Sequence, residues 1–328
     1  MFDQTIHIDL TLPRSWNQCS PEQLETIAAC IMKHTAMADR YHPFDWMDVK
    51  SELFFLLTET EIIRIETAED DPDDTTYICR HLQKKKFFKS HFSIFNLRPW
   101  QVHYWIDTQF KWLDDEKSTL IFFPYKKLIF TRHWQWRWPF LKKTCHAPAE
   151  LLQNFTWQQY RHLQEYMSMY IDQQNALIKL ISRRHTPEQA AEQQAALKST
   201  RNEFLYILFA SSQQSDRFQA DALSIKKQVT RISEIQWQVI LLWWSGFMHY
   251  LKEHYPRCFK TSDKGKRNKR PPNPLELYTS IIATMQKYIG IDEEKVNNQT
   301  FHIILEQLER IAKENEEIEK MNRRHKIK

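Results

Sequence analysis

Histidine and cysteine side chains are the first candidates for chemistry in this sequence, because both residue types bind metal ions. His249, His254 and Cys258 lie five and four residues apart, on either side of a helix end expected at Pro256. A zinc ion needs ligand atoms that converge at about 2.0–2.3 Å. A five-residue step places His249 and His254 on different faces of a helix, so this spacing argues against a metal site.

Motifs that bind cofactors or activate a nucleophile are absent from the sequence. The chain has three glycines, at positions 246, 265 and 290, whereas a phosphate-binding loop needs two or three glycines within about eight residues. Gly-x-Ser-x-Gly and His-Glu-x-x-His are also missing. We therefore predict a protein that is not an enzyme, with no catalytic residue, cofactor or metal. A metal-assisted enzyme that uses His249 and His254 is a third hypothesis, since catalytic groups can assemble from distant positions.

Residues 84–146 are dense in both aromatic and basic side chains. They hold 13 Lys and Arg against four acidic residues, a local charge of +9, and 17 aromatic residues in 63 positions. Exposed rings can stack on nucleic-acid bases while cations contact phosphates, and Trp and Arg are also enriched at protein interfaces. Residues 133–138 alternate with period two, which puts the tryptophans on one face and favours burial on a sheet. The candidate partner or nucleic-acid surface comprises Arg132, Trp134, Trp136, Arg137, Trp138, Lys142 and Lys143.

The last predicted helix carries a short heptad seam. The seam consists of Ile304, Leu308, Ile311, Asn315 and Ile318. An Asn at a seam position can select register and partner number at a cost in stability. Two heptads are too short for an independent coiled coil. The seam therefore either docks on the body of the chain or joins it to a second copy or a partner.

Two charged stretches have simpler interpretations. Residues 59–74 carry eight acidic residues and one basic residue. They lack the central glycine and closing glutamate of a calcium-binding loop, so we predict a solvated loop. Residues 259–274 are basic and contain proline, which is typical of an exposed linker.

Cysteine spacing and apolar runs predict where the protein acts. The five cysteines are widely spaced and include no Cys-x-x-Cys motif, so no disulfide framework is expected. The longest apolar run, 239–248, covers about half of the roughly 20 residues that a membrane span needs. No signal peptide follows Met1. We predict a cytoplasmic protein, or one associated with a virion, that has no membrane partner.

Most of the chain is patterned for helices. Capping boxes at 20–23 and 156–159 mark two helix starts. Further helices are predicted at 45–57, from 187, and at 232–255, 275–289 and 300–321, with short strands at 6–10, 101–106, 119–123 and 128–131. The predicted fold is mainly α with a minor β element. We divide it into a small mixed α/β part at 1–146, a helical unit at 149–258, the basic linker at 259–274 and a C-terminal helical hairpin at 275–328.

Four stretches of the chain resemble a known family. They are Leu12-Pro13-Arg14-Ser15-Trp16-Asn17 with Pro21-Glu22-Gln23-Leu24, Asn154-Phe-Thr-Trp-Gln-Gln-Tyr160, Trp243-Trp-Ser-Gly246 with Tyr255-Pro256, and the charged final helix after Asn297-Asn298. Together they resemble poorly characterised proteins encoded near tail genes in Bacteroides-type prophages. The resemblance implies a helical accessory protein similar to a tail assembly chaperone, without catalytic residues, whose partners are phage tail proteins of the tape-measure or tube type. A nucleic-acid-binding module built on 84–146 is the alternative.

Overall fold

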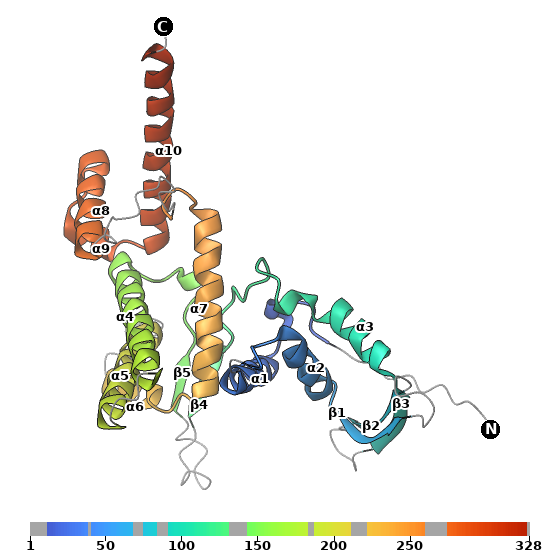
Figure 1. Ribbon diagram of the computed structural model, residues 1–328. Helices are drawn as coiled ribbons and strands as arrows, with labels where there is room; N and C mark the ends of the chain where they lie inside the picture. Colours follow the sequence, from blue (N-terminus) through green and yellow to red (C-terminus); the bar gives the residue numbers. More distant parts are fainter. Residues whose placement is uncertain are drawn as a thin grey trace. The chain divides into compact units, whose positions relative to one another are not determined.

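A computed structural model describes residues 12–38, 41–67, 75–83, 91–130, 143–182, 187–210, 222–259 and 274–326 (Figure 1). Over these residues the fold is mainly α-helical with a minor β element, which confirms the predicted fold class. The chain divides into two compact units. Unit 1 comprises 1–124 and 233–246, and unit 2 comprises 125–232 and 247–328. Each unit thus combines two separate stretches of sequence, whereas the predicted parts are continuous; that four-part division stays a prediction.

Unit 1 joins helices to a three-stranded antiparallel sheet of order β1-β2-β3. Its elements are η1 (Trp16–Gln18), α1 (Pro21–Met37), α2 (Trp46–Leu57), β1 (Thr60–Thr67), β2 (Thr75–Gln83), β3 (His91–Leu97), α3 (Pro99–Gln109), η2 (Lys111–Leu113) and the first part of α7 (Glu234–His254). The predicted capping box at the start of α1 is confirmed. Gln23 N donates to Ser20 Oγ at 3.2 Å, and Ser20 N donates to Gln23 Oε1 at 2.9 Å.

The predicted strand at 101–106 is wrong, because these residues lie in α3. Alternating apolar residues mimic a strand there. Val102 and Ile106 are both buried and lie four residues apart, which is the spacing of one helix face. Pro99 occupies the first helical position, where its fixed φ and missing N–H suit a helix start.

The predicted loop at 59–74 is wrong for residues 60–67, which form β1. Acidic residues gave this stretch the character of a loop, but its β-branched isoleucines suit a strand once a partner is present. The partner is β2, with Ile65 opposite Tyr77 and a register shift between Ile62 and Arg64. Residues 68–74 lie outside the described residues.

The predicted strand at 119–123 is also wrong, although this segment is held firmly by side chains. Asn17 Nδ2 donates to the carbonyl of Thr119 at 3.3 Å, and Asn17 Oδ1 accepts from Ile121 N at 3.0 Å. From α7, Trp243 Nε1 donates to the Ile121 carbonyl at 3.1 Å. A Cβ added at Gly246 would lie 2.3 Å from the carbonyl oxygen of Leu120, so α7 approaches this segment more closely than a side chain allows.

Unit 2 contains the longest helices of the chain and a two-stranded antiparallel sheet. Its elements are β4 (Lys127–Phe130), β5 (Lys143–His146), η5 (Glu150–Leu152), α4 (Trp157–Ser182), α5 (Pro187–Ala210), α6 (Ala222–Val229), the end of α7, α8 (Pro274–Ile289), α9 (Glu293–Asn298) and α10 (Phe301–Lys326). Two distant segments meet in its core. The rings of Tyr160 and Phe301 stack with centroids 4.4 Å apart, and Phe301 N donates to the Phe155 carbonyl at 3.1 Å.

The remaining helix predictions are confirmed with small shifts at the ends. The stretches 45–57, 232–255, 275–289 and 300–321 correspond to α2, α7, α8 and α10. The second capping box is present, since Gln159 N donates to Thr156 Oγ1 at 3.3 Å. Gly290 ends α8 with φ +74°, a left-handed conformation that favours glycine. The predicted strand at 6–10 and residues 260–273 of the linker lie outside the described residues.

Candidate functional site

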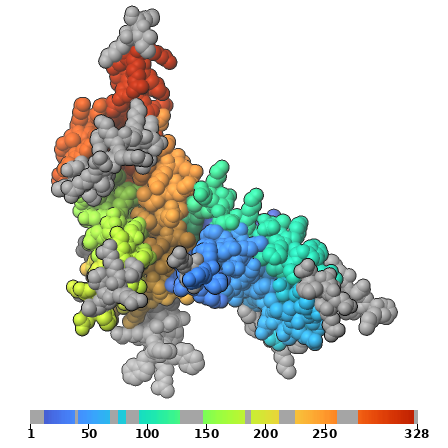
Figure 2. Space-filling model, in the orientation of Figure 1, coloured from blue at the N-terminus to red at the C-terminus, as the bar shows by residue number. Residues whose placement is uncertain are grey.

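A cluster of exposed aromatic residues lies on α3 of unit 1. Trp100 and Tyr104 are four residues apart on one side of the helix and remain 63% and 62% exposed. Trp105 is 38% exposed, and its ring lies 6.4 Å from that of Tyr104, edge to face. We call these three residues the aromatic face of α3. Figure 2 shows the teal α3 segment on the surface of unit 1. Large exposed rings are typical of binding surfaces, because burying them contributes strongly to affinity.

The charge around the aromatic face is balanced. Residues 91–126, which contain α3, carry four Lys and Arg and four Asp and Glu, a net charge of zero. The +9 charge of 84–146 therefore comes from 84–90 and 127–146. Nucleic-acid binding depends on cations that neutralise phosphates. The aromatic face is thus better suited to a protein partner than to a nucleic acid.

Most of the predicted partner or nucleic-acid surface lies outside the described residues. This applies to Arg132, Trp134, Trp136, Arg137, Trp138 and Lys142. Lys143 begins β5, which pairs with β4. Sequence analysis identified the segment as aromatic but missed the aromatic face of α3, because it assigned 101–106 to a strand. Pro99, a helix-start residue, is the signal that could have revealed a helix there.

The predicted seam on α10 divides into a buried half and an exposed half. Ile304 and Ile311 are buried, and Leu308 is half-buried. Asn315 is exposed and accepts a hydrogen bond from Tyr288 Oη at 3.3 Å, while Ile318 is 50% exposed. The first half of the seam thus docks on unit 2 itself. Figure 1 shows the second half of α10 continuing past the end of α8.

An ion-pair network fixes the chain after α7 to α10. Arg257 Nη1 donates to Glu309 Oε1 at 2.9 Å, and Arg257 Nε donates to Glu316 Oε2 at 3.1 Å. The backbone N–H groups of Arg257 and Cys258 also donate to Glu309 Oε2, at 2.8 and 3.1 Å. The Glu309 carboxylate thus accepts three hydrogen bonds, one from a guanidinium and two from backbone N–H groups. These contacts fix the residues that follow α7 to α10.

The structure does not bring together the metal ligands weighed in the sequence. His249 faces Glu253 at 3.3 Å, and the ring of His254 stacks on Tyr250 with centroids 5.0 Å apart. Cys258 Sγ donates to the Leu305 carbonyl at 3.4 Å. Each of these side chains is therefore engaged in a different contact, and they do not converge on a point.

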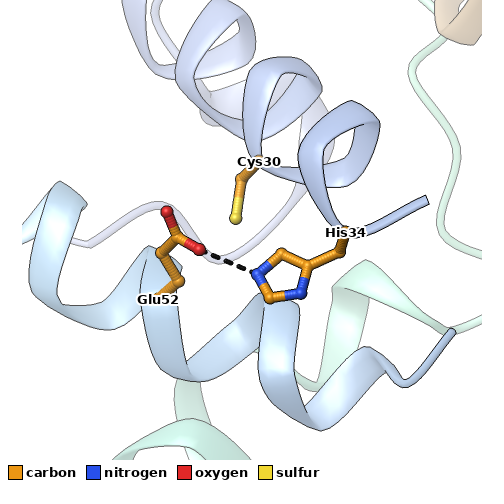
Figure 3. Close-up of side chains that lie close together, drawn as sticks. All are labelled: Cys30, His34 and Glu52. Atoms are coloured by element: carbon orange, nitrogen blue, oxygen red, sulfur yellow. Dashed lines mark hydrogen bonds and ion pairs between the residues drawn. The ribbon is translucent and has the colours of Figure 1, made fainter. Parts of the chain in front are cut away.

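A different group does converge, between α1 and α2 (Figure 3). Cys30 and His34 come from α1 and Glu52 from α2, and their donor atoms lie within 4.8 Å of one another. His34 Nε2 is 2.8 Å from Glu52 Oε2, and Lys33 Nζ donates to Glu52 Oε1 at 2.8 Å. Sequence analysis missed this cluster, although Cys and His four residues apart on a helix form a recognisable signal for shared ligation.

The electrostatics of this cluster weigh against nucleophilic catalysis. Burial, with a smaller contribution from the Glu52 carboxylate, raises the pKa of the Cys30 thiol to about 12. The thiol is therefore protonated at neutral pH, and a thiol is a much weaker nucleophile than a thiolate. The hydrogen bond from Lys33, aided by that from His34, lowers the pKa of the Glu52 carboxyl. Glu52 is therefore an anion that faces a neutral buried sulfur.

The stretches that carry the family resemblance are structural in this fold. Trp16 packs edge to face on Trp112 with centroids 5.1 Å apart, and Asn17 holds the segment at 119–123. Trp243 and Gly246 meet the same segment from α7. These four residues, from two of the stretches, therefore pack in unit 1 and hold its segments together.

Comparison of the chain with protein-family models, with curated proteins and with solved structures finds no match in any of the three. Across the described residues, no helix has both the length and the apolarity that a membrane span requires. The surfaces and clusters of the chain itself are therefore the basis for a functional conclusion.

Proposed function

We propose that this chain is a non-enzymatic interaction protein that binds a phage tail polypeptide, of the tape-measure or tube type, through the aromatic face of α3. One observation carries the binding part of the proposal: Trp100 and Tyr104 are more than 60% exposed on one side of a helix. The resemblance of the four sequence stretches supports the identity of the partner. The cytoplasm, where tail proteins assemble, is the proposed location.

The chemistry of the aromatic face suits an assembly partner. A polypeptide that exposes apolar surface before it is assembled aggregates unless that surface is covered. Trp and Tyr offer large rigid apolar areas at a small cost in side-chain entropy. The opposite side of α3 is anchored by buried Val102 and Ile106, so the aromatic face is presented on a fixed support.

The proposal is tested by a tagged pull-down from the native host, with and without nuclease, read by mass spectrometry. We expect the wild-type chain to recover tail tube or tape-measure proteins whether or not nuclease is added. The double variant Trp100→Ala/Tyr104→Ala should lower recovery at least about tenfold, because each residue has the character of an interface hot spot. The matched control is Ile171→Ala/Ile178→Ala, which removes two exposed apolar residues from α4 in unit 2.

Three outcomes would contradict the proposal. Failure to recover any tail protein, also after co-expression, argues against a role in tail assembly. Equal recovery by the wild type and the α3 variant would show that tail proteins bind to a surface other than the aromatic face of α3. Loss of recovery in the α4 control alone assigns binding to α4.

The alternative is a nucleic-acid-binding module that uses segment 84–146. It is favoured by the nine net positive charges that flank the neutral stretch around α3. This alternative predicts nuclease-sensitive recovery and affinity that falls steeply with salt, because each neutralised phosphate releases a counterion. The variant Trp136→Ala/Arg137→Ala should then weaken binding. Unchanged affinity in that variant would exclude the predicted surface.

A further inference from the structure

We propose that Cys30, His34 and Glu52 form a zinc site that links α1 to α2 in unit 1. The site is separate from the aromatic face of α3, and partner binding by that face does not depend on it. The two proposals can therefore fail independently.

The two helices bring the three donor groups near one point. Cys30 and His34 are four residues apart, so they share one face of α1, and Glu52 faces them from α2 (Figure 3). Ligands at about 2.0–2.3 Å from a tetrahedral zinc ion are roughly 3.3–3.7 Å from one another. The donor atoms here lie within 4.8 Å, with His34 Nε2 and Glu52 Oε2 at 2.8 Å. Modest side-chain rotations would bring all three to an ion.

The donor set favours zinc over magnesium and calcium. One sulfur, one imidazole nitrogen and one carboxylate oxygen match the ligands of zinc sites, whereas magnesium and calcium prefer oxygen alone. Cys30 is buried, but the side chains of His34 and Glu52 are 19% and 29% exposed. An ion can therefore enter from solvent, and a water molecule can take the fourth position.

Binding requires a defined exchange of bonds. Bonds form from the ion to Cys30 Sγ, a ring nitrogen of His34 and one carboxylate oxygen of Glu52. The S–H bond of Cys30 breaks, its proton passes to solvent, and the 3.7 Å hydrogen bond from Cys30 Sγ to the Val49 carbonyl is lost. The contact between His34 and Glu52 also opens. The thiolate and the carboxylate then balance the two positive charges of the ion. Lys33 Nζ now donates to both oxygens of Glu52, at 2.8 and 2.9 Å. It gives up the oxygen that binds the ion and can keep the other, which orients the carboxylate.

The test uses the full chain, freed of metal with a chelator and kept reduced, and titrated with Co²⁺ and then Zn²⁺. We expect one Co²⁺ per chain, with the visible bands of tetrahedral cobalt and a thiolate-to-cobalt charge-transfer band. Zn²⁺ should displace the cobalt, and Mg²⁺ should not. Zinc at 100 times its Kd should raise the Tm of the full chain by roughly 4 °C, because the ion binds only the folded chain.

Matched variants make the assignment specific. Cys30→Ser should remove the charge-transfer band, and His34→Gln and Glu52→Gln should each weaken affinity by more than the roughly 10–100-fold typical of changes next to a ligand. His34 and Glu52 are partly exposed, so these variants should retain the fold, which circular dichroism checks. The controls Cys258→Ser and His254→Gln should bind like the wild type. Absence of stoichiometric binding, an octahedral cobalt spectrum, or wild-type affinity in His34→Gln and Glu52→Gln would overturn the proposal.

Discussion

Aromatic residues serve opposite purposes on α3 of unit 1 and in the core of unit 2. Tyr160 and Phe301 of unit 2 stack on each other and are almost completely buried. Trp100 and Tyr104 of unit 1 are mostly exposed on a helix whose other side is buried. Burial of a ring stabilises the fold that contains it, whereas an exposed ring contributes only when a partner covers it. Substitutions in the two places should therefore separate stability from binding.

The units also differ in how they join distant parts of the chain. Unit 1 uses side chains that reach backbone groups, since Asn17 and Trp243 both bond to the segment at 119–123. Unit 2 has such a contact too, from His302 to the Leu151 carbonyl, but adds backbone pairing of Thr156 with Thr300 and the ring stack beside it. The first arrangement depends on close approach of the backbone, and the second depends on ring volume.

The largest expected effect tests ring volume in unit 2. Phe301→Ala should lower the free energy of unfolding by about 3–5 kcal/mol, because it removes a fully buried ring and leaves a cavity against Tyr160. Urea unfolding at neutral pH measures the change. Phe301→Leu retains part of the volume and should have a smaller effect. A loss below about 1 kcal/mol for Phe301→Ala would contradict the contrast between the units.

The next effect tests close approach in unit 1. Gly246→Ala should lower the free energy of unfolding by about 1–3 kcal/mol, because the added Cβ would lie 2.3 Å from the Leu120 carbonyl oxygen. Alanine is otherwise the better helix former by about 1 kcal/mol. The control is Ser245→Ala at the neighbouring exposed residue, which should leave the free energy of unfolding almost unchanged. A gain in stability for Gly246→Ala, measured by urea unfolding, would show that α7 does not approach this segment closely.

A smaller effect concerns pH and sharpens the description of unit 2. Burial, followed by the charge of His254, lowers the pKa of His302, although a contact of its Nε2 with the Leu151 carbonyl at 2.8 Å opposes the shift. Between the folded and unfolded pKa values the unfolded chain therefore binds more protons. The contribution to stability is complete above about pH 6.5 and is lost as the pH falls through the folded-state pKa. The free energy of unfolding, measured with urea across this pH range, should fall less with decreasing pH in His302→Gln than in the wild type. The same fall in both proteins would refute the prediction.

The smallest effect on stability is expected on α3. Trp100→Ala/Tyr104→Ala should change the free energy of unfolding by no more than about 0.5 kcal/mol per residue, because both side chains are already exposed to solvent. Thermal and urea unfolding measure this directly. A loss of several kcal/mol would mean that these rings support the fold, and the contrast with Phe301 would disappear.

Local signals predicted the helices well because their information is contained in a few neighbouring residues. Ser20 with Gln23, and Thr156 with Gln159, specify helix starts by hydrogen bonds that span three residues. Strands depend on a partner strand outside the segment itself. The acidic character of 60–67 therefore gave no sign of its pairing with β2, and the alternation at 101–106 suggested a sheet that does not form there.

The candidate sites were harder to predict than the fold. Recognising the aromatic face of α3 requires the helical period of 3.6 residues. That period places Trp100 and Tyr104 on one side and Val102 and Ile106 on the other, whereas a period of two places all four on the same side. The Cys30, His34 and Glu52 cluster depends on how α1 packs on α2, and nothing in the spacing between the helices fixes that packing. The seam on α10 was readable from its heptad steps, but its division into docked and exposed halves depends on the rest of unit 2.

The interrupted layout of unit 1 bears on how the chain is made. Residues 1–124 complete their core only with 233–246, and the bond from Trp243 to Ile121 spans 122 positions. A ribosome adds about 5–20 residues per second. The amino-terminal stretch must therefore wait for several seconds, with its contact surface for α7 uncovered, while the insertion at 125–232 is synthesised. A nascent chain stalled before residue 246 should remain sensitive to proteases at sites that the completed chain protects.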